Sequence, residues 1–201
     1  MPDTFLSEQR KAKIRSVLGH RQKGLELVLN NIHDPHNVSA ILRSCDAFGV
    51  NSVHLFYDRE AFPPLAKSSS SSAKKWVDRV RHTDPEAMID SLHARGYQCI
   101  ATGFSETARP LPDWDLTRPT AIVMGNEHRG VDENVGRLVD GELYIPMFGM
   151  VQSLNVSVAA ATILYEAMRQ RLGKGMYDQP TFDDDELEAM YNDWCGRGRR
   201  F

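Results

Sequence analysis

The segment from Ile145 to Arg169 constrains the fold more than any other part of this 201-residue chain. A short apolar run at 143–145 ends at Pro146, which has no N–H to donate to a neighbouring strand. After a loop, residues 156–168 predict a helix that is apolar on nearly every side, so we expect it to be buried against its own chain or a partner. Three polar side chains, Gln152, Ser153 and Asn155, lie just before the start of this helix. A loop that joins a strand end to a buried helix is where α/β proteins place a ligand.

The rest of the chain predicts strands that alternate with helices. Apolar runs at 25–29, 53–57, 97–102 and 120–124 read as strands, and a weaker one lies at 76–80. Helices are expected at 7–18, 37–49, 84–96 and 132–139, and a last short one after Asp183, with Ser7, Asn37, Asp84 and Asp183 as their N-caps. This alternation indicates an α/β fold of one domain, with a parallel sheet and helices on both faces.

Composition excludes several classes of protein. The longest apolar run, 158–165, is far shorter than the roughly 20 residues that a membrane span needs. The first residues are polar and charged, unlike a signal peptide, so we expect a cytoplasmic protein that no membrane holds. The three cysteines show no metal-ligand spacing, which favours reduced thiols and no metal site.

The net charge of −3 says nothing about nucleic acid, but its distribution does. Basic residues crowd the first predicted helix, namely Arg10, Lys11, Lys13 and Arg15. Acidic residues gather at 183–188, just before a basic tail. The basic helix is either a contact surface for a polyanion or an ordinary solvated helix face.

Two further segments carry polar groups at strand ends. In residues 31–43, Arg43 lies on the side of small neighbours, where its forked donors could reach a phosphate or simply face solvent. His33 and His36 have no matching ligand cluster and read as loop histidines. In residues 121–131, glycines after an apolar strand let the backbone approach a ligand closely. Glu127 there either orients the loop or binds a substrate hydroxyl, or it is solvated.

The second of these segments matches neither of two common nucleotide motifs. It lacks the Gly-x-Gly-x-x-Gly pattern of dinucleotide-binding proteins, and it lacks the Gly-Lys-Ser/Thr of a phosphate-binding loop.

Taken together and in this order, the segments 31–43, 121–131 and 145–165 resemble the SpoU/TrmH branch of the SPOUT superfamily. Its members are RNA ribose 2′-O-methyltransferases that use S-adenosylmethionine, and the likeness covers about residues 5–180. The resemblance implies a parallel sheet with a C-terminal trefoil knot, a feature that periodicity alone would not predict.

Carried over position by position, the resemblance implies the site residues. The catalytic positions are Asn37, Arg43, Glu127, Ser153 and Asn155. The cofactor positions are Thr102, Gly125, Asn126, Gly130, Ile145, Met147, Ser153 and Leu154. Arg10, Lys11, Lys13 and Arg15 are then expected to contact RNA.

Within the branch, the chain is most similar to the bacterial enzymes that methylate guanosine 18 in the D-loop of tRNA. The resemblance implies a homodimer that takes S-adenosylmethionine and tRNA. We expect a basic helical extension at 1–23, a catalytic domain at 24–174 and a C-terminal extension at 175–201. Two alternatives remain open: methylation of ribosomal RNA or another tRNA position, and a non-catalytic RNA-binding module on the same fold.

Overall fold

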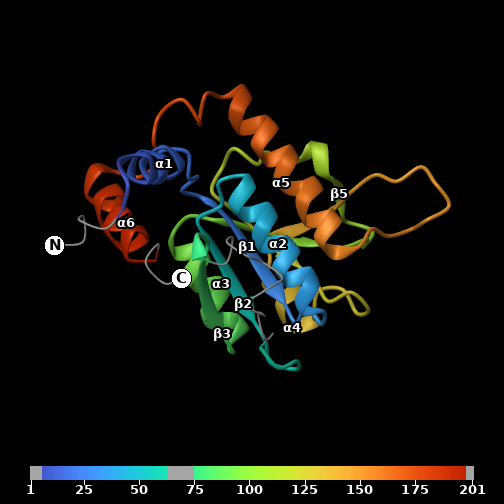
Figure 1. Ribbon diagram of the computed structural model, residues 1–201. Coiled ribbons are helices and arrows are strands. Elements are labelled where there is room, and N and C mark those ends of the chain that lie inside the picture. Colours follow the sequence, from blue (N-terminus) through green and yellow to red (C-terminus); the bar gives the residue numbers. More distant parts are fainter. Residues whose placement is uncertain (1–5, 63–74, 198–201) are drawn as a thin grey trace.

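A computed structural model describes residues 6–62 and 75–197 (Figure 1). Its helices are α1 (Glu8–Leu18), α2 (Pro35–Ala47), α3 (Pro85–Ala94), α4 (Glu133–Gly136), α5 (Val156–Gly173) and α6 (Asp184–Arg197), and η3 (Leu111–Asp113) is a 3₁₀ turn. Its strands are β1 (Leu25–Asn30), β2 (Ser52–Phe56), β3 (Asp78–His82), β4 (Gln98–Thr102), β5 (Arg109–Pro110), β6 (Thr120–Met124) and β7 (Gly141–Tyr144). The predicted α/β class is therefore confirmed.

The strands form one seven-stranded parallel sheet in the order β3-β2-β1-β6-β4-β7-β5. β6 lies between β1 and β4, with Leu29 opposite Met124 and Ala101 opposite Val123. The carboxyl ends of these strands therefore meet at one edge of the sheet. In open parallel sheets this edge is where ligands bind, because the loops that follow neighbouring strands converge there.

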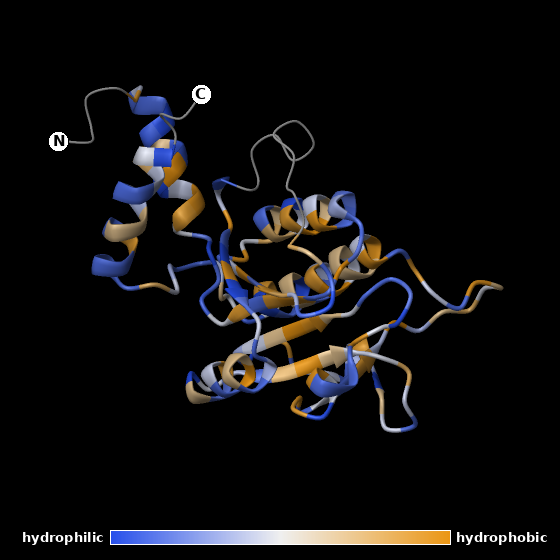
Figure 2. Ribbon diagram, turned by 90° about the horizontal axis from the view of Figure 1, so that it is seen from below, coloured by the Kyte–Doolittle hydropathy of each residue, from blue (hydrophilic) through white to orange (hydrophobic). Residues whose placement is uncertain are grey.

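Each face of the sheet is covered by helices, and alternate strand residues point into two separate cores. α2 and α5 pack on one face over residues such as Leu27 and Ile122, whereas α3 and α4 pack on the other over Val28 and Val123. Figure 2 shows the apolar strands enclosed between helices on both sides. Every residue of β1 is buried because both of its faces are covered, which is typical of parallel strands.

The start of α2 differs from its prediction. Asp34, not Asn37, is the N-cap: its carboxylate accepts a hydrogen bond from the backbone N–H of His36, and Pro35 is the first helical residue. Proline is well suited to this position because its missing N–H would have no helical partner there. Asn37 consequently lies inside the first turn, and its side chain is free to bond elsewhere.

α5 is less completely buried than its composition predicts. Ala160, Ile163, Leu164 and Ala167 are buried in the core with α2. Val158, Tyr165 and Leu172, spaced seven residues apart, are about half exposed. The described part of the chain therefore covers one side of this helix and leaves an apolar stripe on the other side.

The terminal helices α1 and α6 pack together at one end of the molecule (Figure 1). Ile14 and Leu18 of α1 share a small core with Tyr191 and Trp194 of α6. Ser7 and Asp183 cap these helices as predicted, accepting hydrogen bonds from the backbone N–H groups of Arg10 and Glu186.

Three smaller expectations concern strand limits, the cysteines and membrane spans. β3 begins at Asp78, two residues after the predicted start, and the two-residue β5 was not predicted. The cysteines at 45, 99 and 195 are free thiols and all are buried, as expected for reduced residues. Among the described residues, none of the helices is long and apolar enough to span a membrane.

Candidate active site

A cleft of about 1040 Å³ opens at the carboxyl ends of β4, β6 and β7. Its wall includes all the positions predicted to hold the cofactor: Thr102, Gly125, Asn126, Gly130, Ile145, Met147, Ser153 and Leu154. These residues come from the end of β4, the loop after β6 and the loop that joins β7 to α5. The structure therefore brings the whole predicted set together at the edge where the sheet topology favours a ligand.

The loop after β6 is tightly folded. A side chain at Gly125 would collide with the backbone of Gly130 and Val131, so this close approach requires glycine. Gly130 has φ 73°, in the left-handed region that also favours glycine. Asn126 is buried and ties the loop to the sheet, because its side-chain N–H donates to the carbonyl of Asn31 at 2.7 Å. The loop thus presents a fixed stretch of backbone to the cleft.

The opposite wall is more apolar. Ile145, Met147 and Leu154 lie along it, beside the buried Leu143. The hydroxyl of Thr102 donates to the carbonyl of Val123 at 3.2 Å, which fixes the end of β4 against β6. An apolar slot edged by backbone groups suits a flat aromatic ring, because such a ring needs few but well-placed polar partners.

Three of the predicted catalytic residues form a chain of hydrogen bonds. Glu127 accepts from the side-chain amide of Asn37 at 2.8 Å and from the backbone N–H groups of His33 and Asp34 at 2.9 and 3.2 Å. Asn155 in turn donates to the side-chain oxygen of Asn37 at 3.1 Å. The loop after β6, the first turn of α2 and the N-cap of α5 are thereby joined at one point.

The electrostatics of Glu127 follow from these contacts. Its burial by itself raises the pKa of the carboxyl group, but the hydrogen bonds from Asn37, His33 and Asp34 outweigh burial and lower the pKa. Glu127 is therefore an ionised acceptor that holds surrounding donors in place. This arrangement favours the orienting role among the alternatives that the sequence left open.

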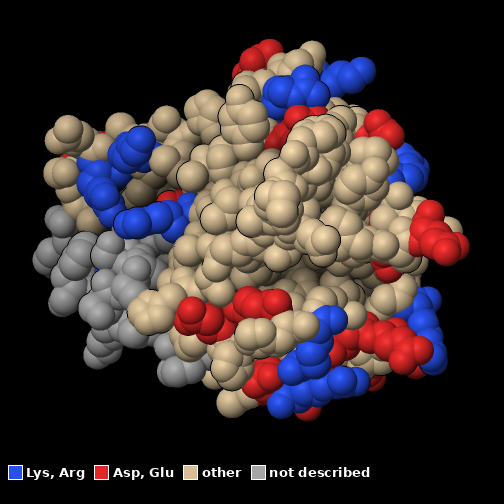
Figure 3. Space-filling view, turned by 90° about the vertical axis from the view of Figure 1, so that its right-hand side faces the viewer, with Lys and Arg blue, Asp and Glu red and all other residues tan. Residues whose placement is uncertain are grey.

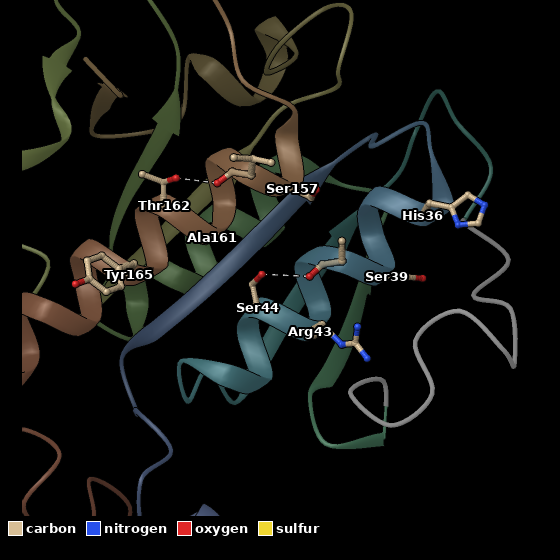
Figure 4. A pocket seen from close by; sticks show the side chains of 10 residues that line it. His36, Ser39, Arg43, Ser44, Ser157, Ala161, Thr162 and Tyr165 are labelled. Carbon is tan, nitrogen blue, oxygen red and sulfur yellow. Dashed lines mark hydrogen bonds between the residues drawn. The ribbon is translucent and has the colours of Figure 1, made fainter. Parts of the chain in front are cut away.

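Arg43 lies apart from the hydrogen-bonded residues Glu127, Asn37 and Asn155, in a groove of about 610 Å³ between α2 and α5. Figure 4 shows its guanidinium directed away from α5, on the far side of Ser44. Tyr165, Ser157 and Thr162 of α5 line the opposite side of the same groove. Arg43 is exposed, so its donors are accessible to a ligand that enters from outside the chain.

Three of the four basic residues predicted on α1 have partners within the chain. Lys11 forms an ion pair with Glu8 at 2.9 Å, and Arg15 forms one with Glu188 of α6 at 3.2 Å and lies over the ring of Tyr191. Arg10 lies over the ring of Trp76. Lys13 is exposed. The serine run at 68–72 and Lys74 lie outside the described residues.

A buried polar cluster beside the cleft was missed by sequence reasoning. Asp132 is 2% exposed and accepts from the side-chain amides of Asn30 and Asn31. Arg59 and Arg129 lie over the same carboxylate, with N–O distances of 3.5 and 3.7 Å. The available signal was the pair of asparagines at the end of an apolar strand, where buried amides need partners.

One group of residues in the described part of the chain has side chains that could hold a metal ion: His93, Cys99 and Asp140, whose ligand atoms lie within 4.8 Å of one another. Asp140 already accepts hydrogen bonds from His93 and from the backbone N–H of Cys99, at 3.1 and 2.7 Å. Burial raises the pKa of the Cys99 thiol to about 12, which disfavours the thiolate that a metal needs. The prediction that no metal is used stays a prediction.

Comparison with known proteins places this geometry in context. The family model described as SpoU rRNA Methylase matches residues 24–165. A tRNA (guanosine(18)-2′-O)-methyltransferase of Thermus thermophilus is 45% identical over 188 residues, which cover 94% of this chain and 96% of the relative.

Two solved structures are also similar. The TrmH/SpoU tRNA modifying enzyme of A. aeolicus has a TM-score of 0.90 and 36% identity, covering 96% of this chain and 98% of that one. The SpoU methyltransferase AviRb of Streptomyces viridochromogenes, in complex with AdoMet, has a TM-score of 0.67 and 29% identity, covering 77% and 62%. With the segments 121–131 and 145–165 lining one cleft, and Asn37 of the segment 31–43 bonded to both of them, this chain belongs to the SpoU rRNA methylase family.

Proposed function

We propose that this protein transfers a methyl group from S-adenosylmethionine to the ribose 2′-oxygen of guanosine 18 in tRNA. The observation that carries the proposal is the convergence of every predicted cofactor position on one cleft at the carboxyl ends of the strands. The 45% identity to a tRNA (guanosine(18)-2′-O)-methyltransferase, over nearly the whole of both chains, supports this substrate.

The cleft suits S-adenosylmethionine. An adenine ring fits the apolar wall of Ile145, Met147 and Leu154, and the glycine-lined loop at 125–130 leaves backbone groups within reach of the ligand. When bound, the cofactor supplies a methyl group activated by its sulfonium. The protein then has to align the ribose hydroxyl with that group and help the hydroxyl lose its proton.

Arg43 is proposed to bind a phosphate next to the target ribose and to stabilise the negative charge that develops on the 2′-oxygen. We assign Arg43 this role rather than that of proton acceptor because a guanidinium is a poor base. Ser153 and Asn155, at the start of α5, are proposed to position the ribose. Asn37 fixes the start of α5 because it bonds to both Asn155 and Glu127.

A homodimer is proposed because the apolar stripe of α5 has no cover within the described chain. Val158, Tyr165 and Leu172 are 49%, 55% and 53% exposed, and they form one line on the helix. Arg43 lies in the groove beside that line rather than in the cofactor cleft. A second copy packed on α5 would let Arg43 of one subunit serve the cleft of the other, so we propose an active site shared between subunits.

The remaining assignments follow from the family. We propose the C-terminal trefoil knot, a cytoplasmic location, and the division into a 1–23 extension, a 24–174 catalytic domain and a 175–201 extension. The family match at 24–165 and the separate packing of α1 on α6 support this division. Arg10, Lys11, Lys13 and Arg15 are proposed to follow the RNA backbone, and Arg10, Lys13 and Arg15 are exposed.

The test uses labelled S-adenosylmethionine and two transcripts of the same tRNA. The parent transcript should accept one methyl group at guanosine 18, and a transcript with 2′-deoxyguanosine at that position should bind equally well but accept none. Methylation of the deoxy transcript would contradict ribose chemistry. Methylation of ribosomal RNA alone would contradict the tRNA substrate, and no transfer to any RNA would favour a non-catalytic RNA-binding module.

A further inference from the structure

The carboxylate of Glu60 lies between two groups that suit an anion. Its oxygens are 3.4 Å from Nδ1 of His33 and 3.2 Å from Nη1 of Arg129. His33 stands at the N-terminal end of α2, and its backbone N–H donates to Glu127. Glu60 therefore occupies a position directly beside the hydrogen-bonded chain of Glu127, Asn37 and Asn155.

Basic and titratable groups surround this position. The Arg59 side chain is 54% exposed and that of Arg129 is 41% exposed, and the ring of His128 lies 6.3 Å from that of His33. Asp132 and Glu60 formally neutralise the two arginines, and two other carboxylates nearby, Asp58 and Glu127, are engaged by amide donors. Removing the charge of Glu60 takes away the carboxylate that lies between Nδ1 of His33 and Nη1 of Arg129. Figure 3 shows acidic and basic side chains side by side along the lower edge of one face.

The backbone at Glu60 is held by a buried side chain, whereas its carboxylate bonds to side chains at the surface. The side-chain oxygen of Asn31 accepts hydrogen bonds from the backbone N–H groups of Asp58, Arg59 and Glu60 at 3.2, 3.3 and 3.2 Å. Asn31 is itself buried, with φ 51°, and also donates to Asp132. The partners of the Glu60 carboxylate among the described residues are, in contrast, the exposed side chains of His33 and Arg129, so its rotation would leave the backbone bonds of the loop intact.

We propose that this position is a phosphate subsite for the RNA and that Glu60 occupies it in the free protein. A phosphodiester of the substrate displaces the Glu60 carboxylate and takes over its contacts with His33 and Arg129, with Arg59 at its edge. Guanidinium forks and an imidazole recognise phosphate and carboxylate by the same hydrogen bonds, which is why one can stand in for the other. The inference rests on the proposed function, since it names how the same site holds its substrate.

An RNA phosphate is favoured over the carboxylate of S-adenosylmethionine because the donors are solvent-exposed. The His33 side chain is 63% exposed, more than either arginine. A polymer that passes over the surface can reach such a rim, whereas a small cofactor is mostly enclosed when bound. Separate measurements of the affinities for tRNA and for S-adenosylmethionine distinguish an RNA phosphate from the cofactor carboxylate.

The experiment compares Glu60→Gln with the unmodified protein. Filter binding of tRNA over a range of salt concentrations should show about five-fold tighter binding near 0.1 M salt and a log–log slope steeper by about 0.7 to 0.9, as expected for one added phosphate contact. The affinity for S-adenosylmethionine, measured by calorimetry, should not change. Arg129→Gln should weaken tRNA binding, and the double variant should lose the gain made by Glu60→Gln.

Glu86→Gln is the matched control. It makes the same change of charge in the exposed first turn of α3, on the other face of the sheet. An equal gain in both variants, or no gain in Glu60→Gln, would overturn the proposal. A gain only in cofactor affinity would assign the subsite to the cofactor carboxylate instead. Binding is measured without methyl transfer, so failure of the catalytic assay with the unmodified protein would count against the proposed function and not against this subsite.

Discussion

The side-chain amide of Asn155 donates a hydrogen bond to the side-chain oxygen of Asn37 across 118 positions of sequence, at 3.1 Å. Each residue has a second role. Asn155 caps α5 by accepting from the N–H of Ser157 at 2.8 Å, and Asn37 donates to Glu127. This one contact joins the first turns of α2 and α5, the two helices that cover the same face of the sheet.

Replacing Glu127 with glutamine should loosen this junction. Asn37 donates to one carboxylate oxygen and the N–H of His33 to the other, and glutamine replaces one of these acceptors with an NH₂ group. We expect the free energy of unfolding to fall by about 1–3 kcal/mol, the cost of leaving partly buried donors unsatisfied, and methyl transfer to fall with it. Urea denaturation measures the first effect. Glu106→Gln, at an exposed loop position, is the control, and equal stability of both variants would contradict the role of Glu127.

Gly125→Ala should abolish binding of S-adenosylmethionine. The added methyl group would meet the backbone of Gly130 and Val131, so the loop that forms one wall of the cleft would have to move. Gly149→Ala is the matched control, because nothing lies within 4 Å of a side chain there. Calorimetric titration should show binding in the control and none in Gly125→Ala. Normal affinity in both would mean that this loop does not form the cofactor site.

The strands and most helix ends could be predicted from sequence because they depend on local chemistry. Alternation of apolar runs predicted β1, β4 and β6, and the Asp84-Pro85 pair predicted the start of α3. The same logic explains the error at α2: Asp34-Pro35 is an equally good start, three residues before the expected cap. The expected cap, Asn37, instead bonds through its side chain to Glu127 and Asn155.

What the sequence could not predict depends on contacts between distant segments. Asp132 reads as a helix cap, yet it is buried beneath Asn30 and Asn31, about 100 positions earlier in the chain. Arg43 belongs to a predicted motif, but its separation from the cofactor cleft depends on how α2 packs on α5. The apolar pattern of one segment does not predict which distant segment it contacts, so it predicts neither the bonds of Asp132 nor the packing of α2 on α5.

Arg43 provides a test that separates catalysis from cofactor binding. Arg43→Ala should abolish turnover while leaving the affinity for S-adenosylmethionine unchanged, because Arg43 lines a different groove from the cofactor positions. Arg43→Lys should also fail, since an ammonium group cannot reproduce the paired donors of a guanidinium. Single-turnover kinetics and calorimetry measure the two effects. Near-normal turnover of Arg43→Lys would refute the phosphate-binding role.

The dimer prediction concerns the exposed stripe of α5. Val158→Glu places a charge on that stripe, about half exposed in the single chain, so it should leave the fold of the subunit intact and separate the subunits. Light scattering should report a dimer for the unmodified protein and a monomer for the variant. Because Arg43 is proposed to act across the interface, the monomeric variant should also lose turnover. A monomer for the unmodified protein at micromolar concentration would contradict the proposal.

Glu26 predicts how stability depends on pH. Its buried carboxylate accepts hydrogen bonds from both terminal nitrogens of Arg95 at 3.1 and 2.8 Å, and it lies 2.7 Å from Nε2 of His54. Burial by itself raises the pKa of Glu26, but His54 and Arg95 outweigh it and lower the pKa to about 2. In an unfolded chain the pKa is about 4.3. The native state therefore favours the ionised form.

A carboxyl group with a lowered pKa stabilises the fold above its unfolded pKa, and this contribution is lost as the pH falls toward the folded value. Glu26→Gln should therefore be less stable than the unmodified protein by up to about 3 kcal/mol at pH 7. The difference should shrink as the pH falls from about 5 toward 2, because the unmodified protein loses its advantage there. Urea denaturation at pH 7, 5 and 3 measures it. A difference of the same size at pH 3 and pH 7 would mean that packing, rather than the charge of Glu26, supplies this stability.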